Sequence, residues 1–266
     1  MNPCNCHEHC EMTSTYWDSA VAFASRTGHQ LIFGLQPDEK NATGLIEYAA
    51  RKNQSILAFT YGNEIDSTDL FAGYAALRKT IDSGIFVGQI KPLLAGPDVA
   101  LQRHAPLAEA LEGRDSTILD RLNWVDNFTK AVGHALDVVT WHTYDFHANE
   151  VGTEDHQPLN PSTHNTSRLW DTRYLDMATR LAGNMSDIRD KNTPNLPVWL
   201  TETNSVCHQG VANDTNAFLN SVWLVDRLGR MAEQGTPLMV AHTSPPPVAP
   251  PTFSLFPIST PSHLCL

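Results

Sequence analysis

Six short runs of apolar residues recur along the chain, separated by longer segments of mixed character. The runs are continuous rather than alternating, which is typical of parallel strands that are covered on both faces. For the third strand two neighbouring runs are candidates. The predicted strands are Leu31–Leu35, Ile56–Thr60, Ile85–Ile90 (or nearby Leu93–Ala95), Val138–Trp141, Val198–Thr201 and Leu238–Ala241.

The segments between these runs have a helical period. The clearest predicted helix extends from about residue 213 to residue 234, and Gly235 and Pro237 then end it. Its expected buried face carries Phe218, Val222, Val225, Leu228 and Ala232. The other predicted helices are Tyr16–Thr27, ended by Gly28, then Thr68–Asp82, Leu119–Leu136 and Trp170–Arg189.

Alternation of strands and helices predicts a parallel α/β architecture. No glycine-rich phosphate loop follows any of the strands, which disfavours a doubly wound nucleotide-binding fold. Polar residues follow several strands, as in (β/α)8 barrels, which keep their chemistry at that end. We therefore expect an α/β fold of the (β/α)8 TIM-barrel type. Because six strands are found, we expect it to be incomplete, with strands three to eight present.

Composition divides the 266 residues into a start, a core and a tail. We expect residues 1–14 to be unstructured, 15–241 to form a single catalytic domain, and 242–266 to be disordered. From Gly235 to Leu266 there is no Asp, Glu, Lys or Arg, and seven prolines lie between 245 and 261. Such a composition cannot form a packed element.

The formal net charge of −11 argues against a nucleic-acid partner and against an anionic membrane surface. No stretch is long and apolar enough to predict a membrane span. The first residues lack the apolar core of a signal peptide. Six Asn-X-Ser/Thr sequons nevertheless suggest a secretory ancestor, at Asn41, Asn53, Asn127, Asn165, Asn184 and Asn213.

Three cysteines crowd the start of the chain, at Cys4, Cys6 and Cys10, with His7 and His9 among them. One interpretation is a metal site. The spacing matches no standard zinc module and has no second half, so an unstructured start is the favoured alternative. We predict no metal and no organic cofactor.

Two short motifs carry the candidate chemistry. Tyr61-Gly62-Asn63-Glu64 follows one predicted strand, and Thr201-Glu202-Thr203 ends another. Each presents a glutamate at the carboxyl end of a strand. Glycoside hydrolysis needs two such carboxyl groups, one to protonate the leaving oxygen and one to attack the sugar carbon. Surface or loop glutamates are the alternative interpretation.

Several motifs in one consistent order resemble the catalytic barrel of the heparanase-like glycosidases, glycoside hydrolase family 79. The resemblance covers about residues 15–241. Besides the two glutamate motifs, it rests on Leu31-Ile32-Phe33-Gly34-Leu35, Ala95-Gly96-Pro97-Asp98-Val99, Val139-Thr140-Trp141-His142-Thr143-Tyr144 and the helical segment from Phe218 to Gly229.

The resemblance implies that Glu64 is the general acid/base and Glu202 the nucleophile of a retaining β-glycosidase. It implies that Asn63 binds the substrate 2-hydroxyl, that Tyr144 orients Glu202 and that His142 lines the site. Asp98 and Arg103 are further candidates for substrate contact, or alternatively a structural carboxylate and a solvated charge. The implied substrate is a glycan or glycosaminoglycan-like chain, with β-glucuronide the expected bond. The full-length relative would be extracellular, or lysosomal or vacuolar.

The chain also departs from the resembled pattern. From the resemblance we expect the first two barrel strands and the family's β-sandwich domain to be missing from it. The stretch from Val206 to Gly210 and the Pro-rich tail stand where the family binds the uronate carboxylate. Two alternatives therefore stay open: a truncated, inactive remnant that at most binds carbohydrate, and a β-glycosidase for a neutral sugar.

Overall fold

A computed structural model describes residues 12–102, 109–110, 112–146, 171–206, 215 and 217–242. Within them, six parallel strands form one sheet in the order of the sequence. The strands are β1 (Ile32–Leu35), β2 (Ala58–Tyr61), β3 (Leu93–Ala100), β4 (Val138–Phe146), β5 (Val198–Val206) and β6 (Met239–Ala241). The helices are α1 (Ser14–Thr27), α2 (Glu39–Arg51), α3 (Leu70–Asp82), α5 (Ser116–Val132), α7 (Thr172–Asn192) and α8 (Phe218–Glu233), with a short 3-10 helix, η1 (Gly133–Ala135).

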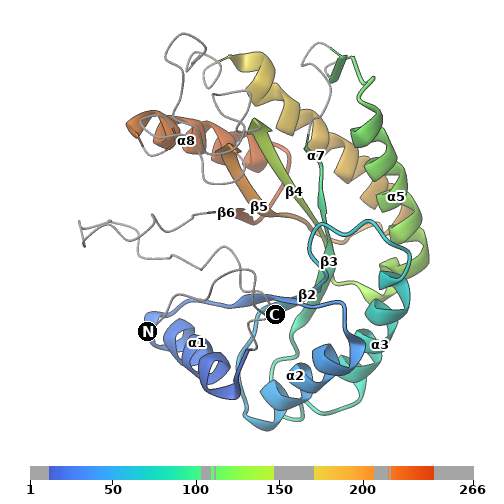
Figure 1. Ribbon diagram of the computed structural model, residues 1–266, viewed down its shortest axis with the longest axis vertical. Coiled ribbons are helices and arrows are strands. Elements are labelled where there is room, and N and C mark those ends of the chain that lie inside the picture. The colour runs from blue at the N-terminus through green and yellow to red at the C-terminus, as the bar shows by residue number, and fades with distance from the viewer. Residues whose placement is uncertain are drawn as a thin grey trace.

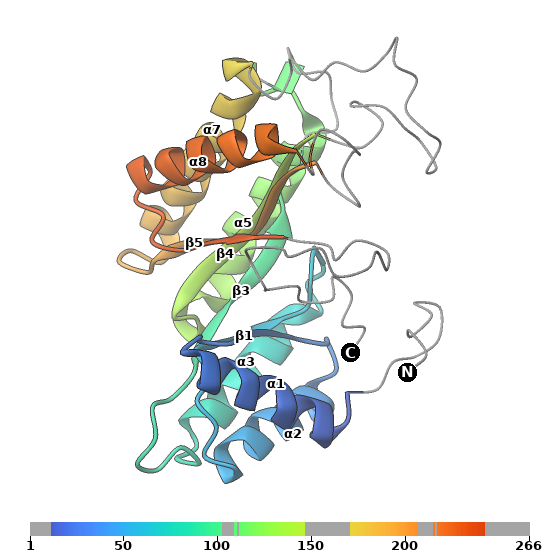
Figure 2. The same cartoon turned by 90° about the vertical axis from the view of Figure 1, so that its left-hand side faces the viewer.

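The sheet is strongly curved, and its helices lie on the outer, convex side (Figure 1). Strands β1 and β6 lie at the two ends of the curve, and the view into its open side shows α8 and α1 at opposite ends (Figure 2). Six parallel strands curled in this way form an incomplete barrel of the (β/α)8 type, as the sequence predicts. The expected unstructured start and Pro-rich tail lie almost wholly outside the described residues.

Burial explains why the strands are continuous apolar runs. All four residues of β2 and all nine of β4 are buried. Helices therefore cover one face of the sheet while side chains fill the other. The third strand is Leu93–Ala100, so the alternative Ile85–Ile90 is wrong. Gly84 and Gly88 both have positive φ angles there, which turns the backbone and leaves Val87 exposed.

Helix α2 was not predicted from the sequence. Its start is capped by Asp38, whose carboxylate accepts a hydrogen bond from the backbone N–H of Asn41. Its buried face is built mainly from small residues, Ala42, Ala49 and Ala50, with Ile46 as the large member. Ala42, Ile46, Ala49 and Ala50 recur at helical spacing, so the sequence pattern does contain this helix.

The other predicted helices are confirmed with shifted ends. Asp115 caps α5 by accepting hydrogen bonds from the N–H groups of Thr117 and Ile118, so this helix begins three residues before the predicted Leu119. It ends at Val132, and η1 follows. At α1, Gly28 has a left-handed φ of 71° and ends the helix as expected.

The buried face predicted for the last helix is wrong. In α8 the buried residues are Trp223, Arg227 and Met231. The buried carboxylate of Asp145 on β4 accepts hydrogen bonds from Trp223 Nε1 (2.5 Å) and from Arg227 Nη2. A buried carboxylate is costly unless it is paired, so the helix turns its polar residues inward. The predicted face is thereby exposed at Phe218, Val225 and Leu228.

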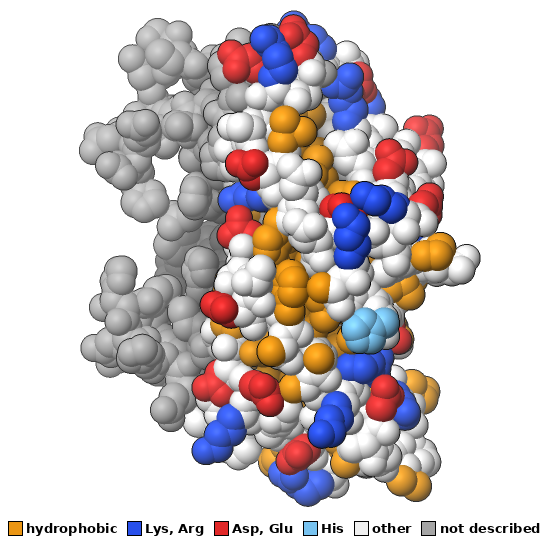
Figure 3. All heavy atoms as spheres, turned by 90° about the vertical axis from the view of Figure 1, so that its right-hand side faces the viewer, with side chains coloured by type: hydrophobic (Ala, Val, Ile, Leu, Met, Phe, Trp, Pro, Cys, Tyr) orange, Lys and Arg blue, Asp and Glu red, His pale blue; other side chains and the backbone are white. Residues whose placement is uncertain are grey.

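The outer face of the molecule mixes apolar, acidic and basic side chains (Figure 3). Charges of both signs are interspersed there rather than gathered by sign. None of the helices in the described ranges combines the length and the apolar character that crossing a membrane requires.

Two tyrosines join the strands below the candidate glutamates. The hydroxyl of Tyr74, on α3, donates to the carbonyl oxygen of Tyr61 at the end of β2 (3.0 Å), and their rings meet edge to face. Gly73 makes room for the Tyr61 ring, because a Cβ atom at Gly73 would lie 2.2 Å from Tyr61 Cε1. The close approach of α3 to β2 therefore requires glycine at this position.

We expect Gly73→Ala to destabilise the fold by about 1–3 kcal/mol, because the added methyl group overlaps the Tyr61 ring. The matched control is Gly44→Ala on α2, where a Cβ atom meets nothing within 4 Å. That variant should gain about 0.5–1 kcal/mol from helix propensity. Urea unfolding of both variants measures the difference. Equal midpoints for the two would contradict this packing.

Candidate active site

The sheet brings the two predicted glutamates to the same end of β2 and β5, which are separated in the sheet by β3 and β4. Glu202 lies within β5, where it is paired in register with His142 on β4. Glu64 follows β2 by three residues, after a turn in which Gly62 has a φ of 79°. Glu64 itself has a φ of 55°, and its N–H donates to the carbonyl oxygen of Asp98 (3.0 Å). These contacts direct its side chain across the carboxyl ends of β3 and β4.

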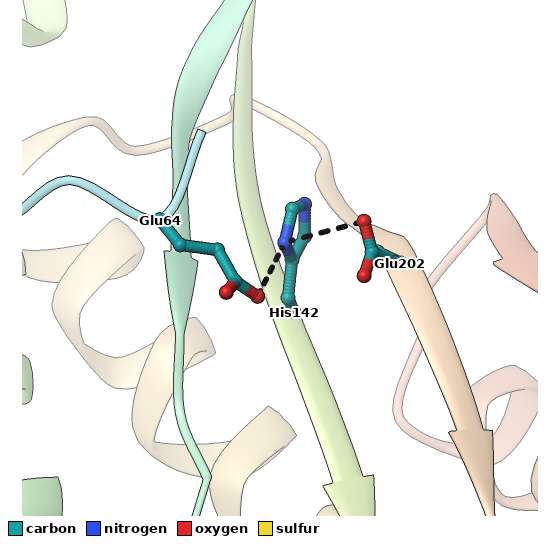
Figure 4. A group of neighbouring side chains, drawn as sticks. All are labelled: Glu64, His142 and Glu202. Carbon is teal, nitrogen blue, oxygen red and sulfur yellow. Dashed lines mark hydrogen bonds and ion pairs between the residues drawn. The ribbon is translucent and has the colours of Figure 1, made fainter. Parts of the chain in front are cut away.

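The imidazole of His142 lies between the two carboxylates (Figure 4). Its Nδ1 is 3.1 Å from Glu64 Oε1 and 3.9 Å from Glu202 Oε2. The histidine side chain is 2% exposed, whereas those of Glu64 and Glu202 are 33% and 27% exposed. Both carboxylates are therefore accessible to a ligand, whereas the imidazole beneath them is shielded from solvent.

Tyr144 lies two residues beyond His142 on β4 and faces the same side of the sheet. Its hydroxyl donates to Glu202 Oε1 at 2.5 Å. Its ring also meets that of His242, after β6, edge to face at 6.2 Å. The Glu202 carboxylate is thus held between Tyr144 and His142.

Asp98 lies behind His142, on the far side of the imidazole from Glu64. Its Oδ1 accepts a hydrogen bond from Thr201 Oγ1 (2.7 Å) and lies 3.5 Å from His142 Nε2. Its backbone N–H donates to Thr140 Oγ1 (2.9 Å). The side chain is 8% exposed, so its contacts are with the protein.

These contacts set the charge of the histidine. Burial alone would lower the pKa of His142, but its hydrogen bonds with Asp98 and Glu64 and the charges of Asp98 and Glu202 raise the pKa to about 10. Burial alone would raise the pKa of Asp98, and its contacts with His142, Thr201 and Thr140 outweigh burial and lower it. The raised pKa of His142 favours the imidazolium form at neutral pH, between the carboxylates.

The predicted residues are thus brought together in part. Glu64, Glu202, His142, Tyr144 and Asp98 form one cluster. Asn63 lies on the same turn as Glu64 and is exposed. Arg103 and the Cys/His-rich start lie outside the described residues.

Thr140 and Thr201 were not singled out from the sequence as site residues, although both contact Asp98. Strand alternation puts Thr201 and Glu202 on opposite faces. The strand registers shift between Trp141 and His142 and between Leu200 and Thr203. Such irregularities re-aim side chains, and a sequence pattern does not reveal them.

A cation could in principle bridge this cluster. One donor atom from each of Glu64, His142 and Glu202 lies within 4.8 Å of the others. The hydrogen bond between Glu64 and His142 and the imidazolium charge already account for this proximity.

Solved glycosidase structures share this fold. The model aligns with a GH51 arabinofuranosidase from Xanthomonas axonopodis pv. citri with a TM-score of 0.55 and 13% identity, over 89% of this chain and 52% of that one. It aligns with a Paenibacillus polymyxa xyloglucanase from glycoside hydrolase family 44 with a TM-score of 0.55 and 12% identity, over 88% and 61% of the two chains. At such low identity these matches support the fold alone.

Curated relatives are similar over most of the chain. Heparanase from Gallus gallus is 28% identical over 251 residues, 90% of this chain and 43% of its own length. Inactive heparanase-2 from Homo sapiens is 23% identical over 248 residues, which cover 90% of this chain and 38% of that protein. The chain thus spans about two fifths of the length of these relatives. The sequence model of a protein family, described as glycosyl hydrolase family 79, N-terminal domain, matches residues 7–229. The chain therefore belongs to that family.

Proposed function

We propose that this chain carries the two catalytic carboxyl groups of a retaining β-glycosidase that hydrolyses β-glucuronide bonds in glycans. The observation that carries the proposal is the approach of Glu64 and Glu202, whose nearest donor atoms lie within 4.8 Å of each other. Retaining glycosidases hold their carboxyl groups about 5–5.5 Å apart, and inverting enzymes need about 6.5–9.5 Å to admit a water. The 4.8 Å limit applies to one oxygen atom of each carboxylate, and this close approach supports the retaining spacing.

In the first step, Glu202 attacks the anomeric carbon while Glu64 gives its proton to the leaving oxygen. A glycosyl ester forms on Glu202, and the released chain departs as an alcohol. The hydroxyl of Tyr144, 2.5 Å from Glu202 Oε1, orients the attacking carboxylate. The His142 imidazolium, 3.1 Å from Glu64, stabilises the carboxylate that remains when Glu64 has lost its proton.

In the second step, Glu64 removes a proton from a water molecule, which attacks the same carbon and releases Glu202. Two inversions at one carbon retain the anomeric configuration. Asn63, exposed beside Glu64, is suited to hydrogen-bond the sugar 2-hydroxyl. The reaction needs no metal or organic cofactor.

The substrate class is inferred from relatives named heparanase. A uronate needs a cationic partner in the site, and we assign Arg103 as the candidate. A neutral sugar such as a glucoside or xyloside is the alternative, because the described cluster is dominated by carboxylates. The relatives suggest an extracellular, lysosomal or vacuolar location. The sequon residues Asn41, Asn53, Asn127 and Asn184 are all exposed, as glycosylation would require.

A mechanism-based β-glucuronidase inactivator with a good leaving group should label Glu202 covalently, because it traps the glycosyl ester of the first step. Intact mass and peptide mapping locate the label. Glu202→Gln should abolish labelling. Glu64→Ala should still be labelled, since a good leaving group departs without an acid.

Labelling by a glucoside or xyloside analogue in place of the glucuronide would shift the proposal to a neutral sugar. Failure of all three analogues to label a folded sample would favour an inactive, carbohydrate-binding chain. One of the relatives is itself named as inactive. A label on a residue other than Glu202 would overturn the nucleophile assignment.

Glu64→Ala should lower kcat for poor leaving groups by about 10²–10⁴-fold, because proton transfer is lost. With an activated aryl glycoside the first step survives, and added azide should restore turnover by replacing the water that Glu64 activates. The product should be a glycosyl azide of retained configuration, which NMR identifies. The matched control is Glu47→Ala on α2, where the carboxylate is 52% exposed and remote from the cluster. A glycosyl azide of inverted configuration would contradict the retaining mechanism.

A further inference from the structure

Asp98 contacts the supports of both catalytic glutamates. Its carbonyl oxygen accepts the N–H of Glu64 (3.0 Å), and its carboxylate accepts the hydroxyl of Thr201, the residue before Glu202 (2.7 Å). The same carboxylate faces Nε2 of His142 at 3.5 Å. One residue on β3 therefore joins the segment after β2 to β4 and β5.

The backbone is bent to present this carboxylate. Asp98 has a φ of 54°, and the pairing of β3 with β4 shifts register between Gly96 and Val99. A left-handed φ is costly for a residue with a side chain and persists only where the surroundings compensate. Here the hydroxyl of Thr140 accepts the Asp98 N–H, which fixes the irregular turn. With a side chain 8% exposed, Asp98 is directed at its neighbours rather than at a ligand.

We propose that Asp98 is a positioning residue, which holds the His142 ring in its charged form with Nδ1 directed at Glu64 and, through Thr201, fixes β5 beside Glu202. This rests on the proposed glycosidase function. In the resulting chain of contacts, Asp98 binds one ring nitrogen and Glu64 the other. Asp98 thereby acts on the acid/base residue through the histidine and touches no substrate.

The charged and titratable groups around the ring come from four elements. Glu64 follows β2, Asp98 lies on β3, Glu202 on β5, and Tyr144 on β4 itself. Further out, burial and the charge of Asp98 raise the pKa of the Tyr74 phenol on α3. The ring of His242, after β6, contacts the Tyr144 ring edge to face. Within the described residues, the His142 imidazolium thus faces three carboxylates, and Asp98 is the most buried of these.

The sign of the effect follows from the charges. Asp98 favours the protonated imidazole, as the raised pKa of about 10 for His142 reflects. Asp98→Asn removes one negative charge, so His142 should lose its proton at lower pH. A reaction that depends on the charged imidazole beside Glu64 should therefore lose rate at lower pH in this variant.

The variant Asp98→Asn suits the test for two reasons. Asn tolerates a left-handed φ better than other residues with a Cβ, apart from Asp itself. Its amide oxygen can still accept the Thr201 hydroxyl. The matched control is Thr201→Val, which removes that hydroxyl and keeps the Asp98 charge.

The deciding experiment is an NMR titration of the His142 ring in the chain with nitrogen-15 in its histidines. We expect the wild type and Thr201→Val to keep the imidazolium above pH 8, and Asp98→Asn to lose it at least about one pH unit earlier. An unshifted titration in Asp98→Asn would overturn the proposal. A titration of His142 near its ordinary pKa of 6.5 in the wild type would also overturn the proposal, because no raised pKa would then need explaining.

The pH profile of kcat/KM for a glycoside with a poor leaving group gives the catalytic measurement, because that reaction depends on the proton that Glu64 donates. Asp98→Asn should shift the alkaline limb to lower pH by a similar amount. A lower rate with an unmoved limb would indicate a merely structural role and overturn the proposal. Absence of wild-type labelling would instead refute the proposed function, and the NMR titration would still decide whether Asp98 controls His142.

Discussion

The contact of one buried imidazole with two half-exposed carboxylates is the interaction on which the rest of this sheet depends. His142 is 2% exposed, and its Nδ1 lies 3.1 Å from Glu64, which follows β2, and 3.9 Å from Glu202 on β5. Two carboxylates held this close repel each other unless a positive charge lies between them. The imidazolium provides that charge, and its own burial is compensated by Asp98 from behind. The buried imidazolium and the carboxylates around it therefore stabilise one another when they are ionised.

Such an arrangement cannot be built from regular strands alone. Each of the pairings β3–β4, β4–β5 and β5–β6 shifts register close to the cluster. Glu64 and Asp98 both adopt positive φ angles there. Irregular backbone of this kind costs free energy and concentrates where side chains must be aimed away from the pleat. The regular parts of the same strands, buried on both faces, provide the stability that holds it.

The sequence predicted what depends on local pattern. Continuous apolar runs gave the strands, and residues at their carboxyl ends gave Glu64, His142, Tyr144 and Glu202 as neighbours. It did not predict what depends on tertiary pairing. The inward face of α8 is set by Asp145, a buried carboxylate on a strand distant in sequence. The contacts of Thr201 with Asp98 arise from a register shift, and no residue pattern signals one.

The charge of the cluster also bears on which sugar the proposed glycosidase would accept. Glu64, Glu202 and Asp98 face one imidazolium, so with every carboxylate ionised the described cluster carries net negative charge. A uronate brought beside it would be repelled, whereas a neutral sugar would not. Tight binding of a glucuronide therefore requires cationic groups beyond these four, and Arg103 is the candidate that the sequence provides. Discrimination between a uronate and a neutral sugar would then depend on residues that surround the carboxylates, while the bond-breaking chemistry would be common to both.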